Sequence, residues 1–289
     1  MNVFVTDAAT RAGVAIVEEL SARGHAVTAA VLREGMNGGD ISLPGVQWTH
    51  SVDESDPQSL LEAMQGCEAL VLAVPLAENM KKVGSNAIKA ASKAGVRHVV
   101  SISCMGASFD AHWRLGREYG FVDLMAEESG IPFTVLRPNM FMQEVFENQS
   151  AIVREESVIR MAHGDAQVSF MDANDLGTCV CSVLEAGGEH AGKTYALTGP
   201  EPLSGQDLAG LLTDAAQKEV GWEGLAEAEY SQTLVDAGVA PWVVEMLVSR
   251  SRIIRRDMAW NATGAVQFLT GNQPKTFAEF AREHAGELR

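Results

Sequence analysis

Cysteine is scarce in this chain, and no pair has a metal-binding or redox spacing. The four cysteines are Cys67, Cys104, Cys179 and Cys181, without a C-x-x-C pair, and the seven histidines are scattered. No metal site is expected from this pattern. The cysteines are interpreted as reduced thiols of a cytoplasmic protein.

Positive charge and long apolar runs are also lacking. The chain has 22 Lys and Arg residues against 38 Asp and Glu residues, a net charge of −16. Nucleic acid is therefore not an expected partner, because a phosphate backbone is bound by an excess of cations. No apolar run approaches the roughly 20 residues of a membrane span, so no membrane partner is expected. The expected partner is therefore a small-molecule substrate, which is apolar or aromatic. The sequence does not decide between a monomer and a homodimer.

The first half alternates strand-like and helix-like segments, which is typical of βαβ units and a parallel sheet. A helical stripe over Gly13–Ala22 follows the first strand, and Asp56-Pro57 has the pattern of a helix start. The fold class predicted is α/β, with a doubly wound parallel sheet of the Rossmann type. The expected strands are Val3–Thr6, Ala26–Leu32, Val46–Thr49, Ala69–Val74, Arg97–Ser101 and Phe133–Leu136.

Beyond Pro138 the pattern changes. Strand-like pieces become short, at Val158–Met161, Val168–Met171 and Thr194–Leu197, and long helices dominate from Ser204. We predict a nucleotide-binding domain over residues 1–153 and a smaller, mostly helical substrate lobe over residues 154–289. The strand near 194–198 can rejoin the main sheet. Ligands of such sheets bind beyond the carboxyl ends of the strands.

The loop after the first strand has lost two glycines. Such loops usually read T-G-x-x-G-x-x-G, and only the last glycine, Gly13, is present here. Asp7 stands where the tight turn favours glycine, and Thr10 where the backbone approaches the phosphates. The loop is still predicted to bind the pyrophosphate of a dinucleotide. The residues assigned to it are Thr6, Asp7, Thr10, Arg11, Ala12 and Gly13.

Asp7 bears directly on cofactor affinity. A carboxylate about 5 Å from one phosphate charge opposes binding by about 3 kcal/mol at an effective dielectric constant near 20. Asp tolerates a left-handed backbone better than most residues, so the turn itself can persist. Two alternatives remain open. Arg11 can compensate the charge, or Asp7 can cap the helix and face solvent.

Two further residues favour a bound nucleotide. Arg33 follows the second strand, where a cation can meet the 2′-phosphate of NADP, and no acidic residue ends that strand to take a ribose hydroxyl. The cofactor predicted is therefore NADP. Asp53, after the third strand, can accept a hydrogen bond from the adenine amino group. Each can also be an ordinary solvated loop residue.

Several motifs occur together along essentially the whole chain. In chain order they are the loop ending at Gly13, Arg33, Asp53 with Asp56-Pro57, Ala73-Val74-Pro75, Ser101 to Gly106, Ser129 to Met142, Phe170-Met171-Asp172 with Asp175, Tyr195 to Pro200, and Pro274 to Phe280. The most specific of them is S-G-x-P-x-T-x-L-R-P-x-x-F-M over residues 129–142. Together they resemble the NmrA-like proteins, which are atypical short-chain dehydrogenase/reductases.

The resemblance implies a Rossmann domain, a small C-terminal substrate lobe and NAD(P)H as cofactor, with Val74 and Pro75 among the cofactor-binding residues. The family resembled contains quinone, dye and carbonyl reductases as well as redox-sensing regulators. Related members often carry Lys or His at the position of Tyr119. Asp123 stands where a Tyr-x-x-x-Lys pair would place its lysine, which argues against the usual carbonyl reduction.

Ser103 and Tyr119 are the catalytic candidates. Ser103 ends the fifth strand at the carboxyl edge of the sheet, and Tyr119 follows in the next segment. A serine and a tyrosine in reach of one another can bind a substrate oxygen and pass a proton. The alternatives are a strand-end hydroxyl that bonds to the backbone and a packing tyrosine.

The substrate pocket is predicted after the sixth strand and in the loop before Tyr119. Methionines there suit an apolar aromatic substrate, although Met and Phe at this spacing also suit a core. The residues predicted are His112, Trp113, Asn139, Met140, Phe141 and Met142. Asp172 and Asp175 are interpreted as helix caps. The arginines between Arg250 and Arg256 are interpreted as a helical face paired with acidic neighbours, with a lid or partner surface as the alternative.

Three functions are weighed in this order. The first is an NADP-dependent oxidoreductase that acts on a small aromatic, quinone-like or carbonyl substrate. The second is a cofactor-independent lyase or isomerase that uses Tyr119 and Ser103 for acid–base chemistry, suggested by Asp7, Thr10 and the missing lysine. The third is a nucleotide-sensing regulator without turnover.

Overall fold

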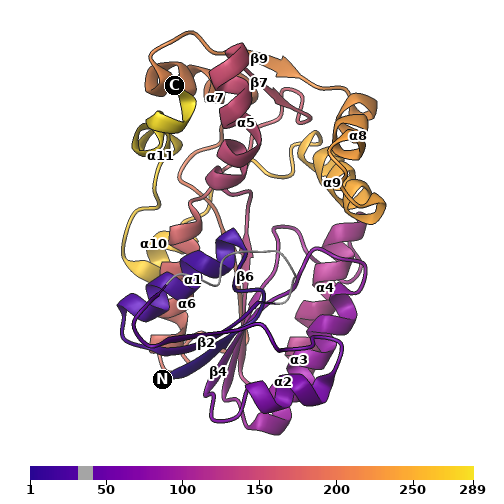
Figure 1. Ribbon diagram of the computed structural model, residues 1–289, viewed down its shortest axis with the longest axis vertical. Helices are drawn as coiled ribbons and strands as arrows, with labels where there is room; N and C mark the ends of the chain where they lie inside the picture. The colour runs from indigo at the N-terminus through magenta and orange to yellow at the C-terminus, as the bar shows by residue number, and fades with distance from the viewer. Residues whose placement is uncertain (32–41) are drawn as a thin grey trace. The chain divides into compact units, whose positions relative to one another are not determined.

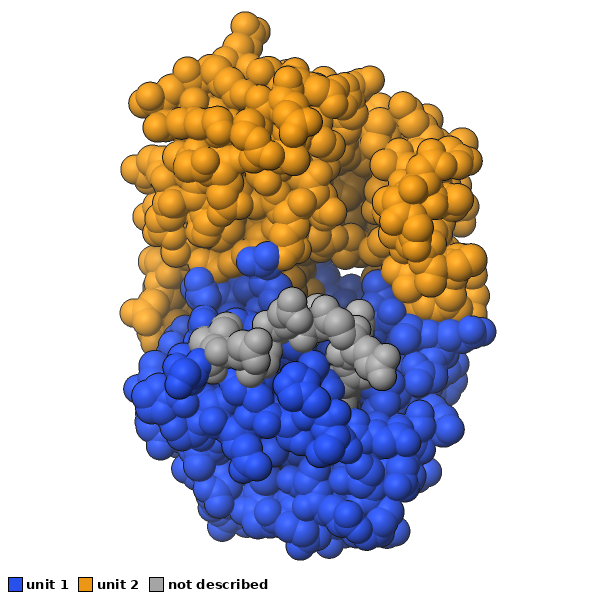
Figure 2. All heavy atoms as spheres, in the orientation of Figure 1, with its two compact units in different colours: residues 1–112, 116–137, 173–196 blue, residues 113–115, 138–172, 197–289 orange. Residues whose placement is uncertain are grey.

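The computed structural model describes residues 1–31 and 42–289 of the chain, and it divides into two compact units (Figure 2). The first unit comprises residues 1–112, 116–137 and 173–196, and the second comprises residues 113–115, 138–172 and 197–289. The chain thus leaves the first unit at residue 138 and later returns to it. The domain boundary after residue 153 stays a prediction.

The first unit is built on a seven-stranded sheet with the order β3-β2-β1-β4-β5-β6-β8. The pairs from β3 to β6 are all parallel. This is the doubly wound order of a Rossmann fold, so the predicted fold class is confirmed. The segment near 194–198 does rejoin the main sheet as β8. The strands are β1 Asn2–Val5, β2 Ala26–Ala30, β3 Val46–Thr49, β4 Ala69–Ala73, β5 His98–Ile102, β6 Phe133–Pro138 and β8 Lys193–Leu197.

Helices cover both faces of this sheet (Figure 1), and all five residues of β4 are buried in consequence. On one face lie α1 (Arg11–Ala22) and α6 (Ala173–Glu185), which pack against each other. The other face carries α2 (Pro57–Ala63), α3 (Met80–Ala94) and α4 (Arg114–Glu128). The predicted start of α2 is confirmed, because the Asp56 side chain accepts from the N–H of Gln58 and Pro57 follows it.

Close packing between α1 and α6 depends on Gly177. A Cβ atom at this position would lie 2.6 Å from the backbone oxygen of Ala15. Only glycine therefore lets the two backbones approach this closely. The contact fastens the returning segment of the chain to the helix that follows the phosphate loop.

The second unit is mostly helical, as expected. Its two short strands, β7 (Val158–Met161) and β9 (Gly221–Gly224), pair in parallel. The strand-like interpretation of Val168–Met171 was wrong, because this segment makes only isolated bridges. The helices are α5 Met142–Glu156, α7 Gly205–Ala216, α8 Glu227–Asp236, α9 Pro241–Ile254, α10 Ala265–Thr270 and α11 Phe277–Glu283, followed by a 3₁₀ turn over Ala285–Leu288.

Aromatic rings form the core of the second unit. The rings of Phe146 and Phe280 meet edge to face with centroids 5.1 Å apart, and Phe170 and Phe277 extend the cluster. The last α-helix, α11, begins with a capping box, in which the Thr276 side chain accepts from the N–H of Glu279.

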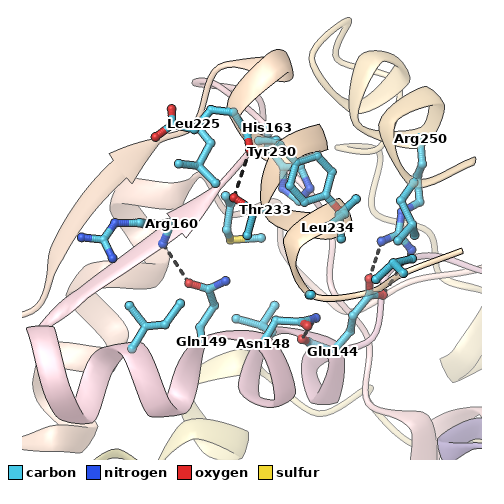
Figure 3. Close-up of a pocket in the computed structure, with 18 of the residues that line it drawn as sticks. Glu144, Asn148, Gln149, Arg160, His163, Leu225, Tyr230, Thr233, Leu234 and Arg250 are labelled. Atoms are coloured by element: carbon cyan, nitrogen blue, oxygen red, sulfur yellow. Dashed lines mark hydrogen bonds and ion pairs between the residues drawn. The ribbon is translucent and has the colours of Figure 1, made fainter. Parts of the chain in front are cut away.

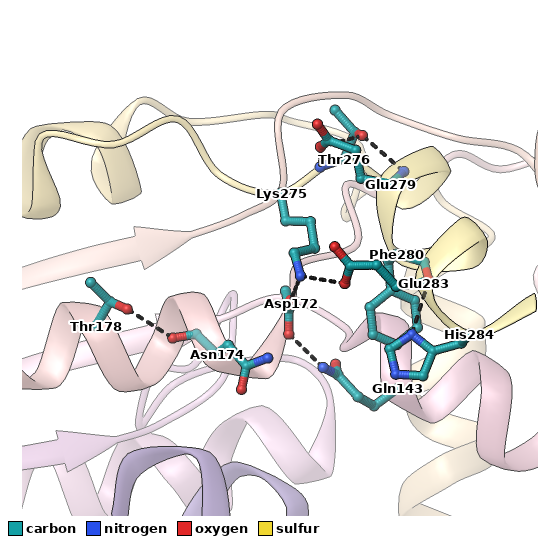
Figure 4. A network of polar contacts seen from close by, with 10 residues as sticks. All are labelled: Gln143, Asp172, Asn174, Thr178, Lys275, Thr276, Glu279, Phe280, Glu283 and His284. Carbon is teal, nitrogen blue, oxygen red and sulfur yellow. Dashed lines mark hydrogen bonds and ion pairs between the residues drawn. The ribbon is translucent and has the colours of Figure 1, made fainter. Parts of the chain in front are cut away.

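A polar network lies beside this core (Figure 4). Asp172 is fully buried; its carboxylate accepts from the side-chain amide of Gln143 and lies 3.3 Å from the ammonium of Lys275. Lys275 also pairs with Glu283 at 2.6 Å. Asp172 therefore has a structural role, which ties α5 to the segment before α11. Asp175 lies in the first turn of α6, where a carboxylate favours the helix dipole.

None of the described helices is long and apolar enough to cross a membrane. Within residues 1–31 and 42–289, no group of His, Cys, Asp and Glu is arranged to hold a metal ion. All four cysteines are free thiols, and Cys67, Cys179 and Cys181 are buried.

Candidate functional site

The phosphate loop connects β1 to α1, and Asp7 occupies its tight turn. The backbone of Asp7 is left-handed, with φ at 48°, and the residue is only 4% exposed. The turn is closed by Thr10, whose N–H and hydroxyl both donate to the Asp7 carbonyl oxygen at 3.2 and 2.9 Å. The turn thus persists without its glycine, as the conformational tolerance of Asp suggests.

Asp7 is not the helix cap. That position belongs to Thr10, whose hydroxyl accepts from the N–H of Gly13 at 3.2 Å. The interpretation of Asp7 as a solvent-facing cap is therefore wrong, because a buried turn residue cannot fill that role. Thr10, which stands at the position of the second lost glycine, is the N-cap of α1, and Thr is well suited to this position.

Gly13 is required by the packing of the loop. An added Cβ would lie 2.6 Å from the Asp7 carbonyl oxygen and 2.7 Å from two backbone atoms of Ala8. All three atoms belong to the backbone and cannot swing away. The retained glycine therefore lets the first turn of α1 lie directly against the loop.

Strands on either side of β1 hold the loop in place. The N–H of Thr6 donates to Val71 on β4, and the Thr6 hydroxyl donates to the carbonyl oxygen of Ala73 at 2.6 Å. On the other side, the N–H of Ala8 donates to Ala30 on β2 at 2.9 Å. The loop thus starts from a rigid edge of the sheet, which fixes where α1 begins.

The start of α1 has the features of an anion site. Among the described residues, the structure shows no hydrogen bond to the N–H of Ala9 or of Ala12, and both residues are partly exposed. Arg11 is exposed at the first position of the helix. Backbone N–H groups at a helix start, together with the helix dipole, favour a phosphate. The loop therefore fits a dinucleotide despite its altered sequence.

The other predicted cofactor residues lie at the ends of neighbouring strands. Val74 and Pro75 follow β4 and are buried. Asp53 is exposed after β3, and its carboxylate accepts from the N–H of Ser55 at 2.8 Å, so it shapes a turn. Arg33, on which the preference for NADP rests, lies outside the described residues. These assignments stay predictions.

A buried network lies at the carboxyl end of β5. The hydroxyl of Ser103 donates to the carboxylate of Asp123 at 2.9 Å, and Ser101 donates to the same carboxylate at 3.3 Å. The guanidinium of Arg137, on β6, approaches it at 3.0 Å. Burial raises the pKa of Asp123, and the charge and hydrogen bond of Arg137 act in the opposite direction.

This network defines what Ser103 can do. Its hydroxyl hydrogen is used by Asp123, so the serine can accept a hydrogen bond from a ligand but cannot donate one while that contact lasts. The alternative prediction, in which the Ser103 hydroxyl bonds to the backbone, was wrong, because the hydroxyl donates to the side chain of Asp123. Sequence reasoning treated Asp123 only as the missing lysine and overlooked it as the centre of a network. The available signal was the pair of serines at alternate positions of one strand.

Tyr119 lies on α4, four residues before Asp123 and on the same helix face. It is partly buried. The helix is fixed beside the loop before it by Gly120, because a Cβ there would lie 2.1 Å from the backbone of Ser108. His112, in that loop, is exposed, and Trp113 is half-buried.

The predicted substrate residues after β6 differ in what they contact. Asn139 is buried and uses its side chain on the backbone, donating to Ala259 at 2.8 Å and accepting from Met140 at 3.0 Å. Met142, 1% exposed, belongs to the aromatic core, whereas Phe141 is partly buried. Met140 lines a cavity, so it is the member of this group that faces open space.

That cavity lies within the second unit and has a volume of about 460 Å³ (Figure 3). Side chains from α5, β7, α8 and α9 surround it. It was missed from the sequence, because its residues are spread over more than 100 positions. Its lining includes Met140, Glu144, Val145, Asn148, Gln149, Ile152, Arg160, Met161, Ala162, His163, Leu225, Tyr230, Thr233, Leu234, Leu247 and Arg250.

Of the four arginines between Arg250 and Arg256, the two on α9 are paired with acidic neighbours, as one of the two interpretations predicted. Arg250 forms a two-pronged ion pair with Glu144 on α5. Arg252 does the same with Glu227 at the start of α8. These pairs fasten α9 to its neighbours.

With the phosphate loop and the sheet order established, the class of protein follows. A family model described as NAD(P)H-binding matches residues 8–169 of the chain, more than half of its length. The chain therefore belongs to this NAD(P)H-binding family, and its identification as an NmrA-like, atypical short-chain dehydrogenase/reductase is confirmed.

Individual relatives are reductases. The NAD(P)H azoreductase of Xenophilus azovorans is 29% identical over 256 residues, which is 89% of this chain and 88% of that protein. The NADPH-dependent quinone oxidoreductase QOR2 of Escherichia coli, solved with NADPH, superposes with a TM-score of 0.85 at 24% identity. The match covers 98% of this chain and 99% of that one. The triphenylmethane reductase of Citrobacter sp., solved with NADP(H), gives 0.82 at 22% identity, with 98% and 99% covered.

Proposed function

We propose that this protein is an NADPH-dependent reductase of a small, apolar aromatic substrate, of the quinone or azo type. The observation that carries the proposal is the preserved geometry of the phosphate loop. Its turn is kept by Asp7 in a left-handed conformation, and Gly13 keeps the start of α1 against it. The family model described as NAD(P)H-binding, which matches residues 8–169, supports the same proposal.

The residues that would hold the cofactor are the partly exposed N–H groups of Ala9 and Ala12, with Arg11 as a nearby cation. Thr10 takes the N–H of Gly13 for itself, which reduces the number of donors left for phosphate. The cofactor supplies a hydride when bound. The preference for NADP over NAD rests on Arg33 and is part of the proposal.

Proton handling is assigned to Tyr119, supported by the network around Asp123. Because Ser103 donates to Asp123, it acts as an acceptor, and the tyrosine remains the donor to a substrate oxygen. Arg137, on β6, supplies a positive charge beside Asp123, which stands at the helix position where the usual lysine is missing. The relatives give no support to the cofactor-free lyase or isomerase alternative.

A titration of the protein with NADPH and with NADH tests the proposal. Binding is followed by nicotinamide fluorescence and by thermal shift, and turnover by NADPH consumption in the presence of 1,4-naphthoquinone or an azo dye. We expect saturable binding, stronger for NADPH, and substrate-dependent oxidation. A protein that shows no response at millimolar cofactor contradicts the proposal.

Ala12 offers a matched pair of variants. Ala12→Glu adds a carboxylate to the first turn of α1, where it favours the helix but repels a phosphate. Ala12→Gln adds a side chain of the same size without charge. We expect NADPH affinity to fall at least tenfold further in the glutamate variant. Equal affinities for the two variants would place the phosphate elsewhere.

A further inference from the structure

The cavity of the second unit is bordered by α8, and this helix points to a ligand site there. None of the ten residues of α8 is buried. Tyr230 and Leu234, one turn apart, both line the cavity, whereas Val235 is 53% exposed. In Figure 3 these two side chains extend from α8 toward Gln149 and Asn148 of α5.

A short helix with one apolar edge needs a packing partner on that edge. Helices of this length are marginal by propensity alone and depend on tertiary contacts. The apolar edge of α8, which is only partly covered by protein, borders this cavity. The cavity of about 460 Å³ lies within the usual range for small-molecule sites. A bound molecule would supply the missing contact.

The walls are apolar, with a few polar groups. Buried methionines, Met140 and Met161, contribute adaptable thioethers. His163 is 9% exposed, and burial together with the charges of Arg250 and Arg255 lowers its pKa to about 3. Its imidazole is therefore neutral at physiological pH and can donate to, or accept from, a ligand oxygen. Partial burial likewise raises the pKa of Tyr230 and keeps its hydroxyl protonated.

The cations that line the cavity are already compensated. Arg250 is held by both oxygens of Glu144. Arg160 is paired with Glu156 at 2.8 Å and with Glu223 at 2.7 Å. Glu229 adds an exposed carboxylate at the rim. Each of the two arginines that line the cavity is therefore already engaged by a carboxylate when a ligand arrives.

We propose that this cavity binds an uncharged aromatic molecule and that the Glu144–Arg250 pair excludes organic anions from it. An anion would lose its hydration without gaining a cation, since Glu144 has neutralised the guanidinium. A neutral ring system with one or two carbonyl oxygens fits the apolar walls and finds donors in His163 and Tyr230. Identifying this ligand as the substrate rests on the function proposed above.

The first experiment compares two probes by calorimetry, without NADPH. These are 1,4-naphthoquinone and its 2-sulfonate, which share a ring system and differ in charge. We expect the neutral quinone to bind at least tenfold more tightly. Equal binding, or tighter binding of the sulfonate, would overturn the proposed discrimination.

Two variants on α8 locate the binding. Leu234→Trp fills the cavity, whereas Val235→Trp adds the same bulk on the exposed side of the same helix. Because α8 buries no residue, both proteins are expected to fold. Naphthoquinone binding should fall at least tenfold in the first variant and stay within twofold of wild type in the second. Retained binding by Leu234→Trp would show that the molecule binds elsewhere.

The ion pair has its own test. Glu144→Gln leaves Arg250 uncompensated, and we expect the affinity for the sulfonate to rise at least tenfold. Glu144→Gln combined with Arg250→Met removes both charges and should restore the preference for the neutral probe. An unchanged preference in the single variant would refute the role of Glu144.

These measurements stand apart from the test of the cofactor site. Ala12→Glu should weaken NADPH binding and leave naphthoquinone binding unchanged. Quinone binding without any NADPH binding would refute the reductase and keep the cavity. NADPH binding without discrimination between the two quinone probes would refute the proposal for the cavity and leave the proposed reductase standing.

Discussion

Replacement of Asp7 separates the two effects of this residue on the phosphate loop. Asp7→Asn removes the charge and keeps the size and the tolerance of a left-handed backbone. Asp7→Ala also removes the charge, but a residue with φ at 48° and no side-chain hydrogen bond costs about 1–2 kcal/mol. Asp7→Gly removes the charge and relaxes the turn. All three variants therefore remove the negative charge, and they differ in the free-energy cost of the left-handed backbone at this position.

The expected magnitude follows from electrostatics. A carboxylate about 5 Å from a phosphate charge opposes binding by about 3 kcal/mol at an effective dielectric constant near 20, roughly a hundredfold in affinity. Because Asp7 is only 4% exposed, water screens it less than a surface charge. We expect NADPH affinity to rise in Asp7→Asn and Asp7→Gly by ten- to a hundredfold.

Two assays distinguish charge from conformation. Fluorescence titration with NADPH gives affinity, and urea unfolding gives stability. The alanine variant should bind more tightly than wild type when folded, yet unfold at a lower urea concentration than the asparagine variant. The reasoning is refuted if Asp7→Asn binds NADPH within twofold of wild type, since the carboxylate would then be directed away from the phosphates.

Two further predictions concern stability. Gly13→Ala should lower the free energy of unfolding by about 1–3 kcal/mol, because the added methyl group meets backbone at 2.6 Å; Gly210→Ala, in an open helical position of α7, should raise it by about 0.5–1 kcal/mol in the same urea assay. A Gly13→Ala protein as stable as wild type would contradict the close packing. His163 is protonated below about pH 6.5 in the unfolded chain and only near pH 3 in the folded one. The free energy of unfolding should therefore decrease as the pH is lowered from about 6.5 to about 3, by on the order of 1 kcal/mol per pH unit. His163→Gln should lack this component, and parallel pH curves for the two proteins would rule it out.

Much of the first unit could be predicted because local patterns decide it. The apolar run at Ala69–Val74 predicted a strand, which is β4 over Ala69–Ala73, and Asp56-Pro57 marked the start of α2. The resemblance to NmrA-like proteins added the cofactor. The start of helix α4 at Arg114 has no clear signal in the sequence, because its first turns carry little apolar periodicity.

The remainder depends on contacts between distant segments. The pairing of β7 with β9 has no local signal, since β9 reads Gly-Trp-Glu-Gly. The cavity joins α5 to α8, and the Asp123 network joins β5, α4 and β6. Neither follows from spacing. The charge and the left-handed turn of Asp7 could be weighed from the sequence, whereas its burial and the role of Thr10 as helix cap became visible only in the fold.

The return of residues 173–196 to the first unit constrains how the protein is made. Synthesis proceeds from the N-terminus, so the ribosome must release the chain through Leu197 before β6 gains its neighbour β8. Until then α1 also lacks the surface that Gly177 brings against Ala15. The nucleotide-binding half therefore cannot mature ahead of the segment 138–172. A truncation after β6 would leave an open sheet edge and an uncovered helix, so this half is not an exchangeable module.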